Sequence, residues 1–288
     1  MAKVFKTFII TYVATLSIVT ALYISAINTN QSIIPSLYSE ANKPTSSPIP
    51  SPKPILQTPP PSKILKNNYH IFQTFNNCGP AALSMILSYF DISENQNVLG
   101  QALRPYQNPQ GDNDDKSVTL EELGEKSREY GFVTYHRSNG NMDMLKLFIT
   151  HDIPIIARTW TKMNENIGHY RIVKGYNEET REIIQDDSLQ GKNLHYSYEN
   201  FNLLWEKFNY EYLVLVSSDK VEIVQAILGN DVDEKTAWKK AANNSENEIK
   251  INPNPDLIGA NDIHSRFNLS VALYNIGEYQ RSVEEFEK

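Results

Sequence analysis

The only cysteine of this 288-residue chain, Cys78, stands where a nucleophile could form. It occurs in the stretch FQTFNNCGPAALSMILSYF, directly before Gly-Pro and at the start of an apolar run. Apolar residues recur there at i, i+3, i+4 and i+7, which predicts a helix buried on one face. These residues are Leu83, Ile86, Leu87 and Phe90.

The start of this helix is predicted from its first residues. Asn77 can act as the N-cap, and Pro80 lies in the first turn, where a missing N–H costs nothing. Cys78 is therefore expected at the helix N-terminus, where unpaired backbone N–H groups and the helix dipole favour a thiolate. A buried cysteine that serves as a small hydrophobic residue is the alternative, and the helix alone does not decide between them.

A nucleophilic thiolate needs an imidazole to take and return its proton, and a third group to orient that imidazole. His169 opens the stretch GHYRIVKGY, which is typical of a β-strand. A second strand, REIIQ, follows after a short turn and ends at Asp186 and Asp187. This hairpin could bring a carboxylate beside the imidazole, which distinguishes His169 from the other histidines. Those are His70, His136, His151, His195 and His264.

These segments resemble the papain-like peptidases related to the double-glycine leader peptidases that process bacteriocins. QTFNNCGPAALSMIL is similar to the family's Gln-x(n)-Cys-Gly-Pro segment, and GHYRIVKGYN to its histidine strand. DDSLQG is similar to its Asp-Pro-x-x-Gly turn, with Ser188 in place of the usual proline. The resemblance covers roughly residues 68–216. It implies an α+β fold in which the helix that carries the cysteine packs on an antiparallel sheet.

The resemblance also implies a role for each matching residue. Cys78 becomes the nucleophile, His169 its general base and acid, Asp187 the orienting residue, and Gln73 the oxyanion donor. Asp186 is adjacent to Asp187, and the alternative that it orients the histidine stays open. This chemistry needs no cofactor and no metal, and a peptide or protein is the implied substrate.

Thiolate attack on an amide develops negative charge on the carbonyl oxygen. The Gln73 amide and the Cys78 backbone N–H could stabilise that charge, and removing one such donor typically costs about 10²–10³ in rate. His169 would protonate the departing amine, and water would then hydrolyse the thioester. Transfer of the acyl group to an amine instead of water uses the same thioester and stays open.

The N-terminus predicts a membrane helix. Residues 8–27, FIITYVATLSIVTALYISAI, contain no charge and are long enough to cross a bilayer. Lys3 and Lys6 precede them, and no basic residue follows until Lys43, which places the N-terminus in the cytoplasm and the rest of the chain outside. A cleaved signal peptide is the alternative. Pro and Ser dominate the linker that follows.

Composition limits the remaining function classes. The net charge of −7 is spread along the chain without a basic stripe, which argues against a nucleic-acid partner. A single cysteine excludes an intramolecular disulfide. The acidic stretch GDNDDKSVT lacks the glycine and distal glutamate of a calcium-binding loop. Thr119 and Glu122 then predict a capping box for the next helix.

The last 70 residues change in character, because they show helical periods and no strand candidates. IHSRFNLSVALYNIGEYQRSVEEFEK resembles a tetratricopeptide repeat, with Gly277 and Tyr279 in its turn. About one repeat is present, and about three are normally needed for an independent stack. This unit is expected to pack on the preceding helices, to mediate oligomerisation or to continue into further repeats, and its helices could bind a protein partner.

The sequence therefore predicts four parts: a membrane anchor (1–28), a Pro/Ser-rich linker (29–63), a papain-like peptidase domain (64–218) and an all-α tetratricopeptide-like segment (219–288). The predicted function is that of a membrane-anchored, extracytoplasmic cysteine peptidase with a Cys-His-Asp triad. A catalytically silent papain-like module that binds peptides is the alternative.

Overall fold

The structure, a computed structural model, describes residues 54–104, 118–163, 165–251 and 260–288. The predicted membrane helix, most of the predicted linker and nearly all of the acidic GDNDDKSVT stretch lie outside these ranges. Among the described residues, no helix is both long enough and apolar enough to cross a membrane.

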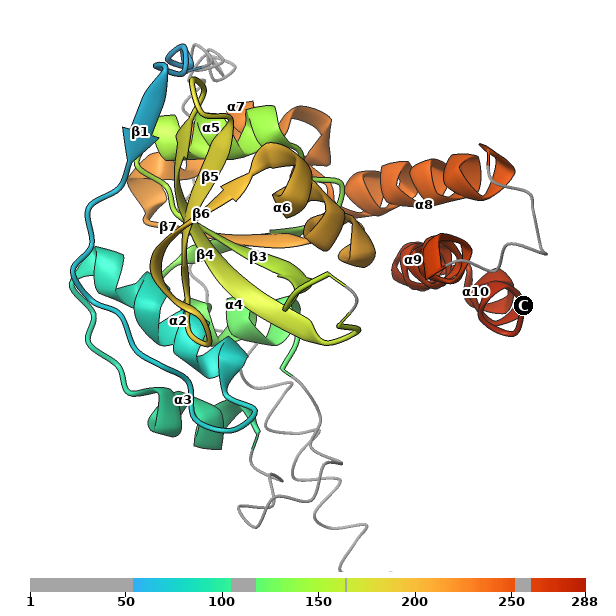
Figure 1. The fold of residues 1–288 in the computed structure, drawn as a ribbon, viewed down its shortest axis with the longest axis horizontal. Coiled ribbons are helices and arrows are strands. Elements are labelled where there is room, and N and C mark those ends of the chain that lie inside the picture. The colour runs from blue at the N-terminus through green and yellow to red at the C-terminus, as the bar shows by residue number, and fades with distance from the viewer. Residues whose placement is uncertain (1–53, 105–117, 164, 252–259) are drawn as a thin grey trace, which may run out of the picture. The chain divides into compact units, whose positions relative to one another are not determined.

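The described residues form a mixed structure of helices and one antiparallel sheet (Figure 1). The strands are β1 (Ser62–Ile64), β2 (Val133–Arg137), β3 (Ile155–Trp160), β4 (Gly168–Asn177), β5 (Glu182–Asp187), β6 (Gly191–Ser197) and β7 (Tyr212–Val216). The helices are α2 (Cys78–Leu87), α3 (Gln96–Leu103), α4 (Leu120–Arg128), α5 (Met142–Thr150), α6 (Tyr198–Trp205), α7 (Val221–Leu228), α8 (Glu234–Ile251), α9 (Ala260–Ile276) and α10 (Tyr279–Phe286).

The sheet has the strand order β2-β7-β3-β4-β5-β6, and every pair is antiparallel. The short strand β1 pairs with the last residues of β4. A Cβ atom added to Gly175 of β4 would lie 2.8 Å from the carbonyl oxygen of Lys63 in β1. This glycine therefore permits the N-terminal segment to lie close against the sheet, on its way to Gln73 and Cys78.

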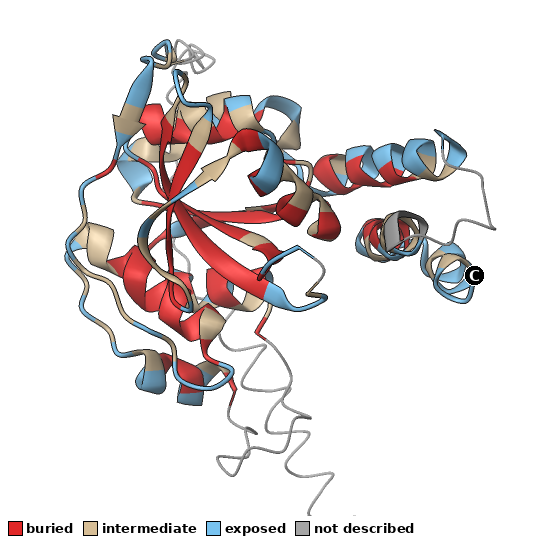
Figure 2. Cartoon of the chain, viewed as in Figure 1, coloured by how far each residue is buried: buried red, intermediate tan, exposed pale blue. Residues whose placement is uncertain are grey.

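Helices cover both faces of the sheet, so the sheet separates two cores. Because neighbouring residues of a strand point to opposite faces, Ile155 and Val173 pack into the core beside α5, α6 and α7. Ile156 and Ile172 pack into the core beside α2, α3 and α4. Near-continuous apolar runs such as IPIIARTW reflect this two-sided burial, which Figure 2 shows for the central strands.

Helix α2 is more deeply buried than the spacing of its apolar residues predicts. All residues from Gly79 to Leu87 are buried, not one face alone. The reason is that α2 contacts β4 as well as α3 and α4, while Tyr69 and Ile71 pack against the same core. The helix ends at Leu87, and Phe90 lies in a short 3-10 turn after it.

Other local predictions agree with the structure. Thr119 and Glu122 form the capping box at the start of α4, through hydrogen bonds in both directions. The strand and hairpin predicted around His169 correspond to β4 and β5, and Asp186 and Asp187 end β5.

The C-terminal residues are helical. Helix α8 packs against α9 through a separate small core, whose buried members are Trp238, Ala241, Ala242, Leu269, Ala272, Leu273 and Ile276. Gly277, with a φ of +87°, ends α9 before α10 begins. Asn268 of α9 also donates a hydrogen bond to the Glu206 carbonyl, 2.7 Å. Resemblance to a tetratricopeptide repeat stays a prediction.

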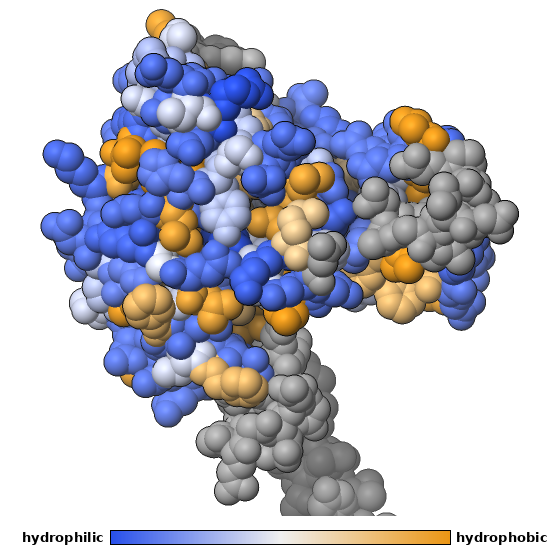
Figure 3. Space-filling model, viewed as in Figure 1, coloured by the Kyte–Doolittle hydropathy of each residue, from blue (hydrophilic) through white to orange (hydrophobic). Residues whose placement is uncertain are grey.

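The face of the molecule seen in Figure 3 is mostly hydrophilic, with apolar residues in small separate groups. Most of the large apolar side chains of the sheet are buried in the two cores and do not reach this surface.

Candidate active site

Cys78 is the first residue of α2, as the sequence predicts. A Cβ atom on Gly79 would lie 3.3 Å from Val118 and 3.4 Å from the Tyr170 ring, so the helix start lies close against β4. Tyr170 is fixed in turn by a hydrogen bond from its hydroxyl to the Val118 carbonyl. Since Tyr170 follows His169 in β4, this packing also brings the cysteine and the histidine to the same place.

Asn77 has a different role from the predicted one. It occupies the N-cap position of α2, but its side chain makes no capping hydrogen bond. Its Oδ1 accepts a hydrogen bond from Arg104 instead, and its Nδ2 donates to Thr74 Oγ1, 2.6 Å. A Cβ atom on Gly100 would lie 2.7 Å from Asn77 Oδ1, so α3 fits closely around this side chain. Asn77, the residue before Cys78, thus links the start of α2 to the end of α3.

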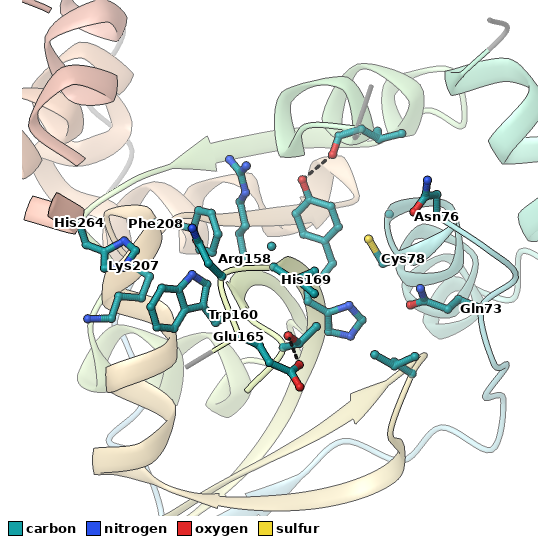
Figure 4. Close-up of a pocket in the computed structure, with 18 of the residues that line it drawn as sticks. Gln73, Asn76, Cys78, Arg158, Trp160, Glu165, His169, Lys207, Phe208 and His264 are labelled. Atoms are coloured by element: carbon teal, nitrogen blue, oxygen red, sulfur yellow. Dashed lines mark hydrogen bonds between the residues drawn. The ribbon is translucent and has the colours of Figure 1, made fainter. Parts of the chain in front are cut away.

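His169 and Asp187 lie on the neighbouring strands β4 and β5. Arg171 is directly opposite Asp187, and His169 is two residues away on the same face of β4. His169 Nε2 is 2.8 Å from Asp187 Oδ1, and both side chains are buried. Nδ1 is the ring nitrogen that does not contact Asp187. Figure 4 shows the imidazole beside the Cys78 sulfur.

The electrostatics of this pair favour its charged form. Burial lowers the pKa of His169, but hydrogen bonds to Asp187 and Cys78 and their charges outweigh it and raise the pKa above the usual value. Burial raises the pKa of Asp187, but the hydrogen bond and charge of His169, together with the charge of Arg171, lower it to about 2. Asp187 is thus an anion at neutral pH.

Asp186 points away from this site. Successive side chains of a strand face opposite sides of a sheet, so Asp186 lies on the other face from Asp187. There its carboxylate pairs with Lys174, 2.6 Å, and accepts a hydrogen bond from the Asn193 backbone N–H, 2.8 Å. Of the two candidates, Asp187 is the one that contacts His169.

Gln73 lines the same cavity as Cys78 and His169. Its backbone N–H donates to the Ser188 carbonyl, 2.8 Å, and the Ser188 hydroxyl donates to Gln73 Oε1, 2.8 Å. Within the described residues, no acceptor binds the Nε2 amide. Ser188 therefore holds the carbonyl end of the amide, which leaves the N–H₂ group as the donor available to the cavity.

Arg171 belongs to the site although the sequence analysis did not select it. It forms a buried ion pair with Asp187 and donates hydrogen bonds from Nε to Thr159 Oγ1, 2.9 Å, and from Nη2 to the Thr161 carbonyl, 2.5 Å. The sequence offered one indication of this role: Arg171 is two residues after His169, so both side chains lie on one face of the strand.

The other histidines contact different partners. His70 Nε2 is 3.0 Å from the Asp187 carbonyl oxygen, so it lies beside the site without contacting the Asp187 carboxylate. Three others pair elsewhere: His136 with Glu211, His151 with the Gln57 backbone N–H, and His195 with Glu182. The His264 ring packs edge-on against Trp160, 4.5 Å between ring centroids.

A cavity of about 630 Å³ extends from Cys78 and His169. Figure 4 shows Gln73 and Asn76 beside Cys78, and Arg158, Phe208, Trp160, Lys207 and His264 toward the other end. Helix α9 contributes Ile263, His264 and Phe267 to its lining. A cavity of this size can hold several residues of a peptide.

The geometry and the sequence now agree with one family. The Peptidase_C39 like family matches residues 57–213, more than half of the chain. The chain belongs to this family. Cys78, His169, Asp187 and Gln73 all lie in the matched range, whereas α8, α9 and α10 follow it.

Several solved structures of peptidases are similar to this C39-like chain. The peptidase domain of Streptococcus ComA, a bifunctional ABC transporter involved in quorum sensing, is 21% identical with a TM-score of 0.39, over 51% of this chain and 97% of that one. A double glycine motif protease from an AMS/PCAT transporter, in complex with the leader peptide, is 14% identical with a TM-score of 0.39, over 53% and 93%. Xylellain, a cysteine protease from Xylella fastidiosa, is 12% identical with a TM-score of 0.34, over 56% and 87%. No curated protein matches the chain.

The low pKa of Asp187 predicts acid sensitivity. A carboxyl group whose pKa is lower in the folded state stabilises the fold above its unfolded pKa, and this contribution is lost as the pH falls through the folded value. Between about pH 5 and pH 1 the wild type should lose about 2 kcal/mol that the Asp187→Asn variant does not lose. Urea unfolding at several pH values measures this difference. Equal pH slopes in the two proteins would contradict it, and Glu211, whose pKa is also about 2, contributes equally to both.

Proposed function

We propose that this C39-like protein is a cysteine peptidase in which Cys78, His169 and Asp187 form the catalytic triad. The observation that carries the proposal is the hydrogen bond between His169 Nε2 and a buried Asp187 carboxylate, with the imidazole beside Cys78. That arrangement holds the ring nitrogen on the cysteine side ready to exchange a proton with the thiol. A peptide or protein is the proposed substrate.

In the proposed reaction, the Cys78 thiolate attacks the carbonyl carbon of a peptide bond. The oxyanion that forms is stabilised by the Gln73 Nε2 amide and the Cys78 backbone N–H at the start of α2. The His169 imidazolium gives its proton to the departing amine, and a thioester remains on Cys78. His169 then takes a proton from water, which attacks the thioester and releases the acid product.

Asp187 would serve this reaction by holding His169 in one orientation and stabilising its charged form. Arg171 would keep Asp187 ionised, since a buried carboxylate without a cation would be costly. Neither residue contacts the scissile bond in this scheme. Both are positioning residues.

We further propose that residues 8–27 anchor the protein in a membrane, with the N-terminus in the cytoplasm and the peptidase domain outside. The support is the uncharged length of this segment and the two lysines that precede it. The C-terminal helices would form a tetratricopeptide-like segment that binds a protein partner.

The first experiment measures alkylation of Cys78 by iodoacetamide against pH, in the full-length protein and in its His169→Ala variant. Cys78 is the only thiol, so every alkylation event reports on it. We expect the wild type to react as a thiolate well below pH 8.5, the usual pKa of a free thiol, and the variant to lose that reactivity. Alkylation no faster than that of free cysteine, and unchanged by the substitution, would leave the peptide-binding module as the function.

The proposed role of Gln73 predicts a coupled effect with Ser188. Gln73→Ala should lower kcat by about 10²–10³, because one oxyanion donor is lost. Ser188→Ala should lower kcat about tenfold, because the amide loses the hydrogen bond that orients it. The double variant should be no slower than Gln73→Ala, as expected when Ser188 acts only through Gln73. Additive losses would assign Ser188 a separate role.

The proposed localisation predicts which reagents reach Cys78 in intact cells. A charged maleimide that does not cross membranes should label Cys78 in whole cells that express the full-length protein. A cytoplasmic protein with an engineered surface cysteine serves as the control and should remain unlabelled until the cells are lysed. Labelling of Cys78 only after lysis would contradict an extracytoplasmic peptidase domain.

A further inference from the structure

Arg158 lies in the cavity beside the Cys78–His169 pair but has no part in the proposed reaction. It belongs to β3, and its guanidinium stacks on the Phe208 ring, 4.4 Å from the ring centroid. Its side chain is 29% exposed and lines the cavity. Figure 4 shows it between Cys78 and Phe208. A Cys78 thiolate lies near enough that its charge helps to raise the pKa of Arg158.

A buried carboxylate holds Arg158 in place. Glu211 Oε2 accepts a hydrogen bond from Arg158 Nη1, 3.1 Å, while Glu211 Oε1 is 2.6 Å from His136 Nε2. The Arg158 backbone N–H also donates to the Glu211 carbonyl, 3.1 Å. Stacking on one side and an ion pair at one corner fix the orientation of the guanidinium before any ligand arrives.

This arrangement leaves most of the donor groups of Arg158 unused. Among the described residues, its only side-chain hydrogen bond is the one from Nη1 to Glu211. A guanidinium has five N–H donors in a planar fork, so Nε and Nη2 remain for a ligand in the cavity. A fork of this kind matches a carboxylate, which can accept two parallel hydrogen bonds.

The other charged groups of the cavity are already engaged. Lys207 is buried, pairs with Glu206 at 2.7 Å and lies over the Trp160 ring. Burial and the charge of Lys207 lower the pKa of His264, so this imidazole is neutral at pH 7. The only glutamate that lines the cavity, within the described residues, is Glu165, which bonds to Thr161 and Lys162.

Arg104 also lines the cavity, but its guanidinium donates to Asn77, next to Cys78. Among the described residues, Arg158 is therefore the cation of the cavity whose Nε and Nη2 groups are oriented by the protein but not engaged by it. The lining also includes the apolar and aromatic residues Trp160, Phe208, Ile263 and Phe267. An apolar lining strengthens a charge-assisted hydrogen bond, because less water competes for the donor.

We propose that Arg158 anchors a subsite for a carboxylate of the substrate, next to Cys78 and His169. The carboxylate belongs either to an Asp or Glu side chain within a peptide or to the C-terminus of a peptide. This subsite deepens the proposed function, since it names a chemical class for the peptide that the cavity accepts. Helix α9 contributes Ile263 and Phe267 to the lining of the same cavity.

Binding without turnover tests this subsite. The full-length Cys78→Ala protein is incubated with a mixture of short peptides whose positions carry Gly, Ala, Leu, Gln or Glu, and the bound peptides are identified by mass spectrometry. The mixture is supplied with free C-termini and, separately, with amidated C-termini. Selection of Glu over Gln by about tenfold or more, the order of a charge-assisted hydrogen bond, is the expected result.

The two forms of the mixture separate the two sources of the carboxylate. Glu selection among amidated peptides assigns the subsite to a side chain. Selection of free over amidated C-termini, without Glu selection, assigns it to a chain end. Absence of both preferences overturns the proposal.

Three variants, each in the Cys78→Ala background, isolate Arg158. Arg158→Gln should lose the preference, and Arg158→Gln combined with Glu211→Gln gives the same test without an unpaired buried carboxylate, should the single variant unfold. Lys207→Gln is the matched control, because it removes a charge from the same cavity but should keep the preference. A folded Arg158→Gln protein that still selects the carboxylate, or a Lys207→Gln protein that no longer does, overturns the proposal.

Cleavage is measured separately, with Cys78 present and with the peptides that bind. Binding selectivity without cleavage contradicts the proposed function and leaves the subsite intact. Cleavage of neutral and acidic peptides at equal rates, with no selectivity in binding, contradicts the subsite and leaves the peptidase intact.

Discussion

The burial of a charged carboxylate, Asp187, is the constraint on which the rest of the site depends. A buried carboxylate is costly unless cations and hydrogen-bond donors surround it. Here His169 and Arg171 supply the cations, and the backbone N–H groups of Leu189 and Gln190 donate to Oδ1 at 2.7 and 3.0 Å. These partners come from β4 and from the turn after β5. Keeping this carboxylate charged therefore requires the hairpin to keep its register.

The register of the sheet also assigns the two adjacent aspartates to different tasks. Asp187 faces the same side of the sheet as His169 and Arg171, and Asp186 faces Lys174 on the other side. A slip of one residue would exchange them and leave both buried charges mispaired. The ion pair of Asp186 with Lys174 thus stabilises the same register as the ion pair of Asp187 with Arg171. Two buried ion pairs on opposite faces favour one alignment of β4 and β5 over its neighbours.

Cys78 and His169 belong to different elements, and packing at the start of α2 sets how they meet. Gly79 permits close contact with Tyr170, and Asn77 links the helix start to α3 through Arg104. Gln73 is positioned from another direction, by Ser188 after β5. The turn after β5 therefore orients both Asp187, which contacts His169, and Gln73, which lies beside Cys78.

The sequence by itself determined the elements and most candidate residues. Three local patterns could be read directly: the helix that begins at Cys78, the strand that begins near His169 and the turn after Asp187. Each depends only on residues that are close together in the chain. Only the tertiary structure decided between Asp187 and Asp186, because strand pairing and facing direction settle which carboxylate meets His169. It also brought in Arg171, Arg158 and helix α9, and it showed Asn77 bound to Arg104 instead of capping α2. Those contacts join residues far apart in the chain, and their partners have no fixed spacing that a sequence pattern could reveal.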